Sequence, residues 1–346
     1  MNIIDKGNYN VISGAQNVVN NGNYNGILGN ANFVQGSLNT VKGDVNTLIG
    51  NYNLVGGNCN VVGGDANQVA GNANKVTGSV NTVVGGNNNL NGNLNVVNGS
   101  SNTMQGSSNN VAGSLNSVIG NSNGILGNVN TVVGSQNKAY GDFNSILGNQ
   151  NSAVGQANQI MGSNNQAMGV SNSQIGSQNT AIGVANTQFG NQNTAIGAYN
   201  TQVGTSNSAV GIGNYAYGNL NTIAGNVNTA VGSSNIIGGN ANTVLGNSNL
   251  VGGDCNKVAG TSNVVAGNTN VAVGNSNFVN GGSNAVNGNN NAVVGGGNLV
   301  IGSSNTIMSG SWGGSSCLPP PPPPPKPSPV PVSCTGSSCN YYRSRY

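Results

Sequence analysis

The chain of 346 residues has few side chains that could carry out chemistry. It contains no His and no Glu, five Asp, eight Lys and Arg together, and five Cys. General acid–base and nucleophilic catalysis both need a positioned titratable group. Asn and Ser share the place after a repeated glycine with four of the five Asp, which are Asp44, Asp65, Asp142 and Asp254. This sharing indicates a turn position that needs a short hydrogen-bonding side chain, so the chain is not expected to be an enzyme.

The five cysteines indicate no metal site. Cys59 and Cys255 occupy the same repeat position, too far apart along the repeat for a disulfide with each other, and each is interpreted as a small side chain at a corner. Cys317, Cys334 and Cys339 form an odd-numbered cluster, in which one intramolecular bridge would leave a thiol for a second chain; their pairing stays open. A zinc site needs a fourth ligand, and the glycine-rich stretches lack the strand–loop–helix context of a phosphate loop. We therefore expect no metal and no cofactor.

The charge pattern narrows the range of partners. Only 4% of residues are charged, and the net charge is +3. The repeats contain no basic cluster, and no apolar run approaches the length of a membrane span, so we expect neither nucleic-acid binding nor a membrane span. Residues 1–14 have no apolar signal-peptide core. The alternatives are a mature or truncated chain, unconventional export, or an intracellular protein.

A seven-residue repeat must position whatever function the chain has. Every seventh residue from Gly22 to Gly302 is glycine, 41 in succession, and an asparagine follows each of them three residues later. The fifth position after the glycine is usually Val, Ile or Leu. An unbroken short period indicates one elongated repeat domain. Gly and Asn disfavour a helix, and Val favours a strand.

The repeat predicts an all-β fold, a parallel β-solenoid or β-roll. One heptad gives one short strand with nothing to pack against, so two heptads form a coil of about 14 residues with two strands back to back. Stacked coils then make two parallel sheets around a thin core, and about 20 coils at ~4.8 Å give a rod near ~95 Å long. The G-x-x-N segments form corners, where a positive φ costs Gly little free energy and is tolerated by Asn. Stacked Asn amides form hydrogen-bonded ladders.

Irregularities in the period predict three parts. Residues 1–21 are an N-terminal cap with the first repeats, and they contain one extra residue near Asn20–Asn21. Terminal repeats of a stacked array must be atypical. The apolar side chains at the start of this cap are therefore expected to close the end of the core; these are Met1, Ile3 and Ile4. Residues 22–308 are the heptad-repeat β-roll.

Residues 309–346 are predicted to combine a cap residue with a disordered tail. Trp312 is the one Trp of the chain and stands where a cap for the open core would be useful. All ten prolines follow it, beginning with seven in succession from Pro319 to Pro325. This composition is typical of polyproline II, a stiff spacer.

The middle of the repeat leaves its register open. Between Ala139 and Ala230 the inward position becomes mostly Ala or Gln, while the residue before the glycine becomes large. In one interpretation the register is unchanged, and Ala faces laddered Gln across the core. In the other the register flips, so that Ile182 points inward and Ala181 outward. A buried row of Gln needs every amide satisfied, which counts against the first, and the unbroken Gly–Asn phase counts against the second. The register of residues 139–231 therefore stays undecided.

Outward positions of the flank register form a column that could bind a regular surface. It has Thr or Ser at nearly every coil, beside a second column of mostly aliphatic residues that runs from Ile119 to Leu245. Thr and Ser are also good exposed strand residues in general. However, a stiff, uncharged array of hydroxyls and methyls with no pocket suits ordered water better than a small ligand. The predicted ice-binding residues are Thr103, Ser117, Thr131, Ser145, Ser173, Thr187, Thr201, Thr229 and Thr243.

The repeat also resembles a known family. NTVVG at Asn81–Gly85 and Asn130–Gly134, and NSVIG at Asn116–Gly120, are similar to the repeat of the ice-binding, recrystallisation-inhibiting antifreeze proteins of ryegrass and related grasses. The likeness covers about residues 7–307. It implies a left-handed β-roll with inward Val, Asn ladders near the corners, and ice adsorption on one flat sheet. This chain lacks the leucine-rich region of many grass relatives, is longer, and is poorer in Thr.

Two weaker likenesses concern the middle and the tail. NTAIG, at Asn179–Gly183 and Asn193–Gly197, resembles the S-V-A-I-G repeat of trimeric autotransporter adhesin heads, and this likeness favours the flipped register. The sequence has no coiled-coil stalk or membrane anchor to accompany it. The proline tail is similar to hydroxyproline-rich wall proteins of plants and green algae, which implies attachment to an extracellular matrix.

The sequence thus predicts a non-enzymatic protein that adsorbs to ice through a flat Thr/Ser/aliphatic sheet and inhibits crystal growth or recrystallisation. The alternative is a structural or adhesive rod of the cell surface or cell wall, displayed on the proline-rich spacer. Expected partners are an ice or ordered-water surface, cell-wall or matrix material through the tail, and a second copy through the tail cysteines. The expected location is extracellular or in the cell wall.

Overall fold

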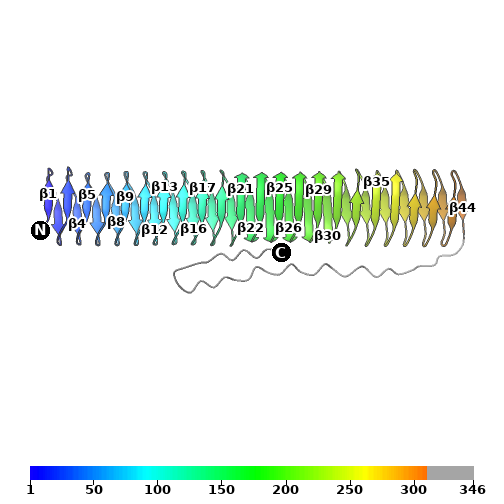
Figure 1. Cartoon of the computed structure of the whole chain (residues 1–346), viewed down its shortest axis with the longest axis horizontal. Coiled ribbons are helices and arrows are strands. Elements are labelled where there is room, and N and C mark those ends of the chain that lie inside the picture. The colour runs from blue at the N-terminus through cyan, green and yellow to red at the C-terminus, as the bar shows by residue number, and fades with distance from the viewer. Residues whose placement is uncertain (310–346) are drawn as a thin grey trace, which may run out of the picture.

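The chain folds into a straight rod of stacked coils (Figure 1). The structure is a computed structural model that describes residues 1–309, and within them it contains strands and turns but no helix. Trp312, the proline-rich tail and the cysteines 317, 334 and 339 lie outside the described residues. Each sheet has 22 strands, which at ~4.8 Å per strand gives a rod about 100 Å long. The predicted all-β parallel solenoid is confirmed.

Successive strands alternate between two sheets. The odd-numbered strands form one sheet, called the odd sheet here: β1 (Ile3–Asp5), β3 (Val18–Asn20), β5 (Phe33–Gln35), β7 (Thr47–Ile49), β9 (Val61–Gly63), β11 (Lys75–Thr77), β13 (Asn89–Asn91), β15 (Thr103–Gln105), β17 (Ser117–Ile119), β19 (Thr131–Val133), β21 (Ser145–Asn149), β23 (Gln159–Ser163), β25 (Ser173–Ser177), β27 (Thr187–Asn191), β29 (Thr201–Thr205), β31 (Tyr215–Asn219), β33 (Thr229–Val231), β35 (Thr243–Asn247), β37 (Lys257–Thr261), β39 (Val271–Val273), β41 (Ala285–Asn287) and β43 (Leu299–Ile301).

The even-numbered strands form the even sheet: β2 (Val11–Ser13), β4 (Gly26–Leu28), β6 (Thr40–Lys42), β8 (Leu54–Gly56), β10 (Gln68–Ala70), β12 (Thr82–Val84), β14 (Val96–Asn98), β16 (Asn110–Ala112), β18 (Gly124–Leu126), β20 (Lys138–Tyr140), β22 (Ser152–Gln156), β24 (Gln166–Val170), β26 (Thr180–Val184), β28 (Thr194–Ala198), β30 (Ser208–Ile212), β32 (Thr222–Ala224), β34 (Ile236–Gly238), β36 (Leu250–Gly252), β38 (Val264–Ala266), β40 (Phe278–Asn280), β42 (Ala292–Val294) and β44 (Thr306–Met308).

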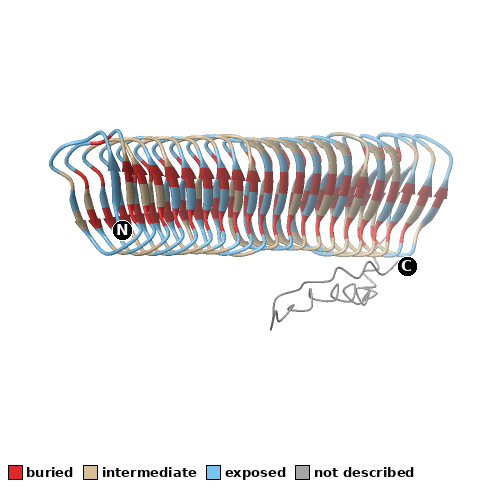
Figure 2. Ribbon diagram, turned by 60° about the vertical axis from the view of Figure 1, so that its left-hand side comes forward, coloured by how far each residue is buried: buried red, intermediate tan, exposed pale blue. Residues whose placement is uncertain are grey.

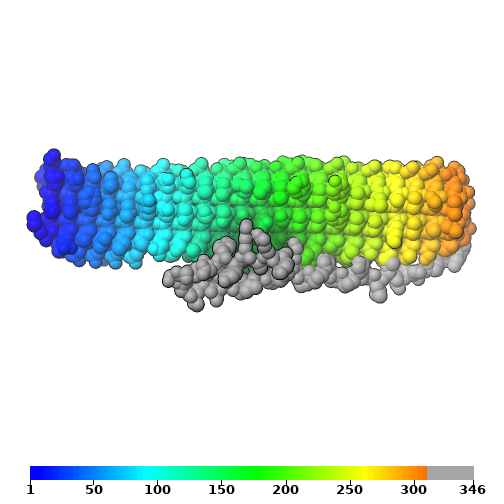
Figure 3. All heavy atoms as spheres, in the orientation of Figure 1, coloured from blue at the N-terminus to red at the C-terminus, as the bar shows by residue number. Residues whose placement is uncertain are grey.

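Pairing within each sheet is parallel and joins residues one coil apart. Val83 pairs with Val97 in the even sheet, and Val118 pairs with Val132 in the odd sheet, 14 residues on in both cases. Identical repeat positions therefore lie above one another along the rod, and the side-chain atoms line up in rows (Figure 3). Because of this stacking, any residue repeated every 14 positions becomes a continuous column on one surface.

The first two coils each contain one extra residue. Asn21 and Lys6 both adopt positive φ, at 50° and 52°, and the Asn21 and Gly22 N–H groups donate to the carbonyl oxygens of Asp5 and Lys6. The two insertions therefore stack as one bulge. The insertion near Asn20–Asn21 was expected from the break in the glycine period, and the equivalent insertion at Lys6 was missed because no earlier glycine precedes it.

Glycine is required at the corners for two separate reasons. Gly85 has a φ of 129°, a conformation that residues with a Cβ rarely adopt. A Cβ on Gly85 would also collide with the carbonyl oxygen of Gly99 in the next coil. The second positive φ of each corner falls on the residue before the ladder asparagine, such as Val80 at 61°, and not on that asparagine as expected. Apolar, aromatic and polar side chains all occur at this left-handed position, for example Val80, Tyr24 and Ser101.

The position after the corner glycine holds a short polar side chain for a specific bond. The Asp44 Oδ1 accepts a hydrogen bond of 2.6 Å from the Asn30 N–H, and the Asp44 N–H donates to the Asn58 Oδ1 at 2.8 Å. Each side chain thus holds the backbone of the preceding coil. The aspartates are turn residues, as their pattern predicted.

The repeated asparagines form two buried ladders in which most amides use both Nδ2–H groups and the oxygen; within the described residues, the Nδ2 groups of Asn179 and Asn193 bond only to a glycine carbonyl. The Asn81 N–H and Nδ2–H both donate to the Asn67 Oδ1 at 3.0 Å, and the second Nδ2–H donates to the Gly92 carbonyl at 2.8 Å. The Asn81 Oδ1 in turn accepts from the N–H and Nδ2–H of Asn95. Because buried amides are costly unless they are paired, this pairing is what allows a polar residue inside the corner of every coil.

The core is one residue deep on each side. The second residue of each strand points inward and is buried along nearly the whole rod (Figure 2). In the flanks this residue is usually Val, Ile or Leu, and each such side chain contributes roughly 1.5–3 kcal/mol by leaving water. At the N-terminal end the expected closure of the core is wrong, since Met1 is 95% exposed and Ile4 is 49% exposed. Ile4 does point inward, but no coil lies beneath it.

The middle of the rod keeps the register of the flanks. Ala181 is fully buried, while Ile182 is 39% exposed and points outward. The flipped alternative, which the likeness to adhesin heads had favoured, is therefore wrong for this segment. The strands from β21 to β31 also extend to five residues, compared with three in most of the flanks.

This register buries three glutamine side chains, and a hydrogen-bonded ladder among them lowers the free-energy cost of burying their amides. The Gln174 Nε2–H donates to the Gln188 Oε1 at 2.8 Å, and the Gln188 Nε2–H donates to the Gln202 Oε1 at the same distance. Each Gln also donates across the thin core to a backbone carbonyl of the even sheet, as Gln188 does to Thr180 at 2.9 Å. Among residues 1–309, the one buried Gln oxygen without a partner is the Gln174 Oε1, since the next residue down the column is Ile160.

Candidate functional site

The predicted ice-binding residues all lie on the outer face of the odd sheet. Each is the first residue of its strand, none is buried, and neighbours pair directly, as Thr187 does with Ser173 and Thr201. We call this row, from β15 to β35, the hydroxyl column. Two side chains interrupt it, Gln159 on β23 and Tyr215 on β31. The longest run without interruption outside these breaks is the four residues from Thr103 to Ser145.

A second column accompanies the hydroxyl column two residues further along each strand. Its side chains point outward and are mostly aliphatic; those from β17 to β35 are Ile119, Val133, Leu147, Met161, Ile175, Phe189, Val203, Tyr217, Val231 and Leu245. We call this row the aliphatic column. Within residues 143–253 the chain has no charged side chain. The surface therefore presents hydroxyls and hydrocarbon at one strand spacing, with no charge to orient water differently.

The outer face of the even sheet is less regular. Its first outward position varies in the first half of the rod, where it holds Leu54, Gln68 and Lys138, and Thr or Ser occupies it on successive even-numbered strands only from β26 to β32. In those central strands, however, aliphatic side chains fill the other outward positions, including Ile182, which is 39% exposed, and Val184, which is 43% exposed. The two faces thus differ along most of the rod and approach each other in composition only in the middle.

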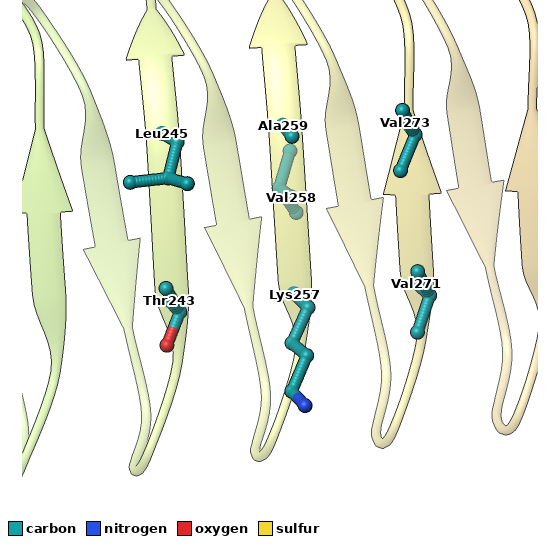
Figure 4. A pocket seen from close by; sticks show the side chains of 7 residues that line it. All are labelled: Thr243, Leu245, Lys257, Val258, Ala259, Val271 and Val273. Carbon is teal, nitrogen blue, oxygen red and sulfur yellow. The ribbon is translucent and has the colours of Figure 1, made fainter.

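The hydroxyl column ends at β37. Lys257 stands there in place of Thr, paired with Thr243 on one side and Val271 on the other. Beside it Ala259 interrupts the aliphatic column between Leu245 and Val273, which leaves a shallow hollow on the surface (Figure 4). A cation and a short side chain in the same strand break the flat array, so the regular surface spans β15 to β35. The Lys and Ala in the repeat could have marked this end from the sequence.

The two cysteines of the described residues differ. Cys59 carries a free, exposed thiol at its corner, as interpreted from the sequence. Cys255, at the equivalent corner position, is disulfide-bonded, which the interpretation as a plain corner residue missed. Both have the left-handed φ of 59° that this corner position imposes.

The fold and this surface define a class: a rigid β-solenoid that presents a flat, stacked array of side chains. Residues 1–92 match a family model described as the grass antifreeze beta roll. The match confirms the resemblance to ryegrass-type ice-binding proteins over these residues. A search of curated proteins found no match.

The matched residues and the predicted site do not coincide. The family match ends at residue 92, within the corner after β13, whereas the hydroxyl column starts at Thr103 on β15. The same pairing and the same Asn ladder continue through both parts, for example from Asn88 to Asn102. The scaffold of the matched part therefore extends along the rod, while the surface residues beyond it must be judged by their own geometry. The described residues include no helix that could span a membrane.

Proposed function

We propose that this protein is a non-enzymatic ice-binding protein that adsorbs through the hydroxyl and aliphatic columns of the odd sheet and blocks crystal growth or recrystallisation. One observation carries the proposal: between β15 and β35, Thr or Ser lies in register on every strand of the odd sheet except β23 and β31, on one flat, uncharged face. Parallel strands repeat every ~4.8 Å, so these hydroxyls form a lattice-like row.

The shape of the surface supports a lattice as the ligand. Small-molecule sites are concave and bury most of their ligand, whereas the columns form a flat strip along a stiff rod. Because each Thr is held by parallel pairing on both sides, its hydroxyl and methyl groups keep one spacing without the ligand. Such preorganisation reduces the ordering cost of adsorption. A solid surface also makes contact with many coils at once, so weak contributions add along the rod.

We place this activity outside the cell or in the cell wall. Support comes from the sequence of the proline-rich tail and from the antifreeze family matched by residues 1–92. Binding of wall or matrix material through the tail, and association of two copies through the tail cysteines, are further parts of this proposal. They would hold the rod where ice grows.

The test compares two faces of the same coils. The full chain should inhibit ice recrystallisation at micromolar concentration, and the double variant Thr187→Lys, Thr201→Lys should lose this inhibition because two long cations stand out from the flat odd face. The matched control is Thr180→Lys, Thr194→Lys, which puts the same charges on the even sheet of neighbouring coils. The control should retain the inhibition.

The opposite pattern would refute the proposed face. If the even-sheet variant loses inhibition and the odd-sheet variant keeps it, the even sheet is the adsorbing surface. If the unmodified chain has no effect on ice, the ice-binding function is wrong, and the alternative of a structural or adhesive rod becomes the leading one. Circular dichroism of each variant shows whether the coils remain folded.

A further inference from the structure

Asn98, Gly99 and Ser100 form the one N-x-S/T tripeptide of the chain. Such a tripeptide, with no proline in the middle, is the acceptor for N-linked glycosylation. Asparagine precedes a corner glycine again at residues 21, 91, 280 and 287, but Asn or Gly follows there instead of Ser. The ladder asparagines cannot complete the tripeptide either, because the position two residues later points into the core.

Asn98 is accessible, whereas the ladder asparagines are buried. It is the last residue of β14, and its side chain is exposed on the even sheet, between Val84 and Ala112 of the neighbouring strands. Its side-chain amide makes no hydrogen bond within the described residues, whereas the Nδ2 of the adjacent Asn95 is bound twice inside the corner. A glycan on Asn98 would therefore disturb neither the core nor a ladder.

We propose that the Asn98 Nδ2 is N-glycosylated when the chain enters a eukaryotic secretory pathway; this rests on the proposed extracellular location. The sugar donor is a lipid-linked oligosaccharyl pyrophosphate. A bond forms between the Nδ2 and the anomeric carbon, the bond from that carbon to the pyrophosphate oxygen breaks, and the lipid pyrophosphate leaves with the electron pair. The amide nitrogen loses one proton, and nothing is oxidised or reduced.

The glycan would stand on the face opposite the proposed ice-binding surface. Asn98 belongs to the even sheet, while the hydroxyl column starts on the next strand along the chain, β15, in the odd sheet. Gln105 holds the same strand position on β15 that Asn98 holds on β14, and Gly106 and Ser107 follow it. The substitution Gln105→Asn therefore places an equivalent acceptor on the odd sheet, with the same local sequence.

The experiment measures mass. The full chain is directed into the secretory pathway of a eukaryotic host and analysed by intact mass and peptide mass spectrometry before and after peptide-N-glycosidase treatment. We expect one glycan on the unmodified chain, located at Asn98, and none on Asn98→Gln or on Ser100→Ala, which keeps the asparagine. Gln105→Asn should carry two glycans. An unmodified secreted chain without a glycan would overturn the proposal, and most clearly if Gln105→Asn acquires one.

A second measurement separates this proposal from the ice-binding one. The glycan at Asn98 should leave inhibition of ice recrystallisation unchanged relative to the enzymatically deglycosylated chain, while the added glycan of Gln105→Asn should reduce it. If the chain has no effect on ice, the mass result still decides the glycosylation. If the Asn98 glycan itself abolishes inhibition, its assignment to a face that ice does not contact is wrong.

Discussion

The flanks and the middle of the rod share one scaffold but fill it differently. In the flanks Val83 and Val97 line the core, and charged residues occur at corners and on strands. In the middle Ala181 faces a glutamine ladder, and residues 143–253 carry no charge. The Asn ladders and corner glycines run through both regions. The fold therefore depends on backbone stacking at the corners more than on the identity of the core residue.

The comparison first predicts that corner glycines are equally essential in both regions. Gly57→Ala in a flank and Gly183→Ala in the middle should each cost more than about 3 kcal/mol, because both glycines have positive φ and a Cβ would meet the glycine carbonyl of the next coil. Gly56→Ala is the control, since a Cβ there meets nothing within 4 Å. Thermal unfolding and amide hydrogen exchange measure the loss. A tolerated Gly183→Ala would show that the middle is held differently.

The glutamine ladder should behave as a unit. Gln188→Leu leaves the Gln174 Nε2 with one acceptor fewer and the Gln202 Oε1 without its donor, so it should cost about 1–3 kcal/mol. Replacing all three glutamines with Leu removes the stranded partners together. The triple variant should therefore lose less stability than three times the single variant. Denaturant unfolding of both variants checks this, and simple additivity would contradict a coupled ladder.

The core residues of the flanks and of the middle should not be interchangeable without a loss of stability. Ala181→Val adds two methyl groups to a core already filled by glutamine side chains, and overpacking of this kind costs about 1–3 kcal/mol. Val83→Ala makes the opposite change in the flank and should also destabilise, by leaving a cavity. The paired melting temperatures measure both effects. A neutral Ala181→Val would mean that the middle core has spare volume.

The smallest change in stability is expected when aspartates of the flanks are replaced by asparagine. Asp65→Asn keeps the side-chain oxygen that accepts the Asn51 N–H at 2.7 Å, so the free energy of unfolding should change by less than about 0.5 kcal/mol. Asp44→Asn should behave in the same way. Melting temperatures at low and high salt provide the measurement. A clear loss of stability would show that these carboxylates do more than hold a turn.

The candidate surface was predictable from the sequence only in part. The 14-residue coil follows from the heptad, and it brings Thr187 and Thr201 together once strands pair in parallel. The end of the surface at Lys257 and Ala259 could also have been inferred, because both interrupt a repeated pattern. The exposure of the surface in the middle could not, because an inward Ile182 would have turned Thr187 and Thr201 away from solvent.

The sequence by itself determined the architecture. Its period requires two short strands in each coil, its glycines require corners with positive φ, and its asparagines require a ladder, because a buried amide at every coil has no other complete set of partners. Those requirements are local and repeat without exception, so they leave no alternative stacking. They do not depend on which side chain fills the core.

Only the tertiary structure decided which face of the middle strands is inside. Neighbouring residues of a strand point to opposite faces, and both Ala181 and Ile182 are apolar, so local pattern gives no preference. The choice depends on whether buried glutamines find acceptors. The structure supplies them from the next coil and from carbonyls such as that of Thr180 on the opposite sheet, eight residues back in the chain. Such partners exist only after the coils have stacked.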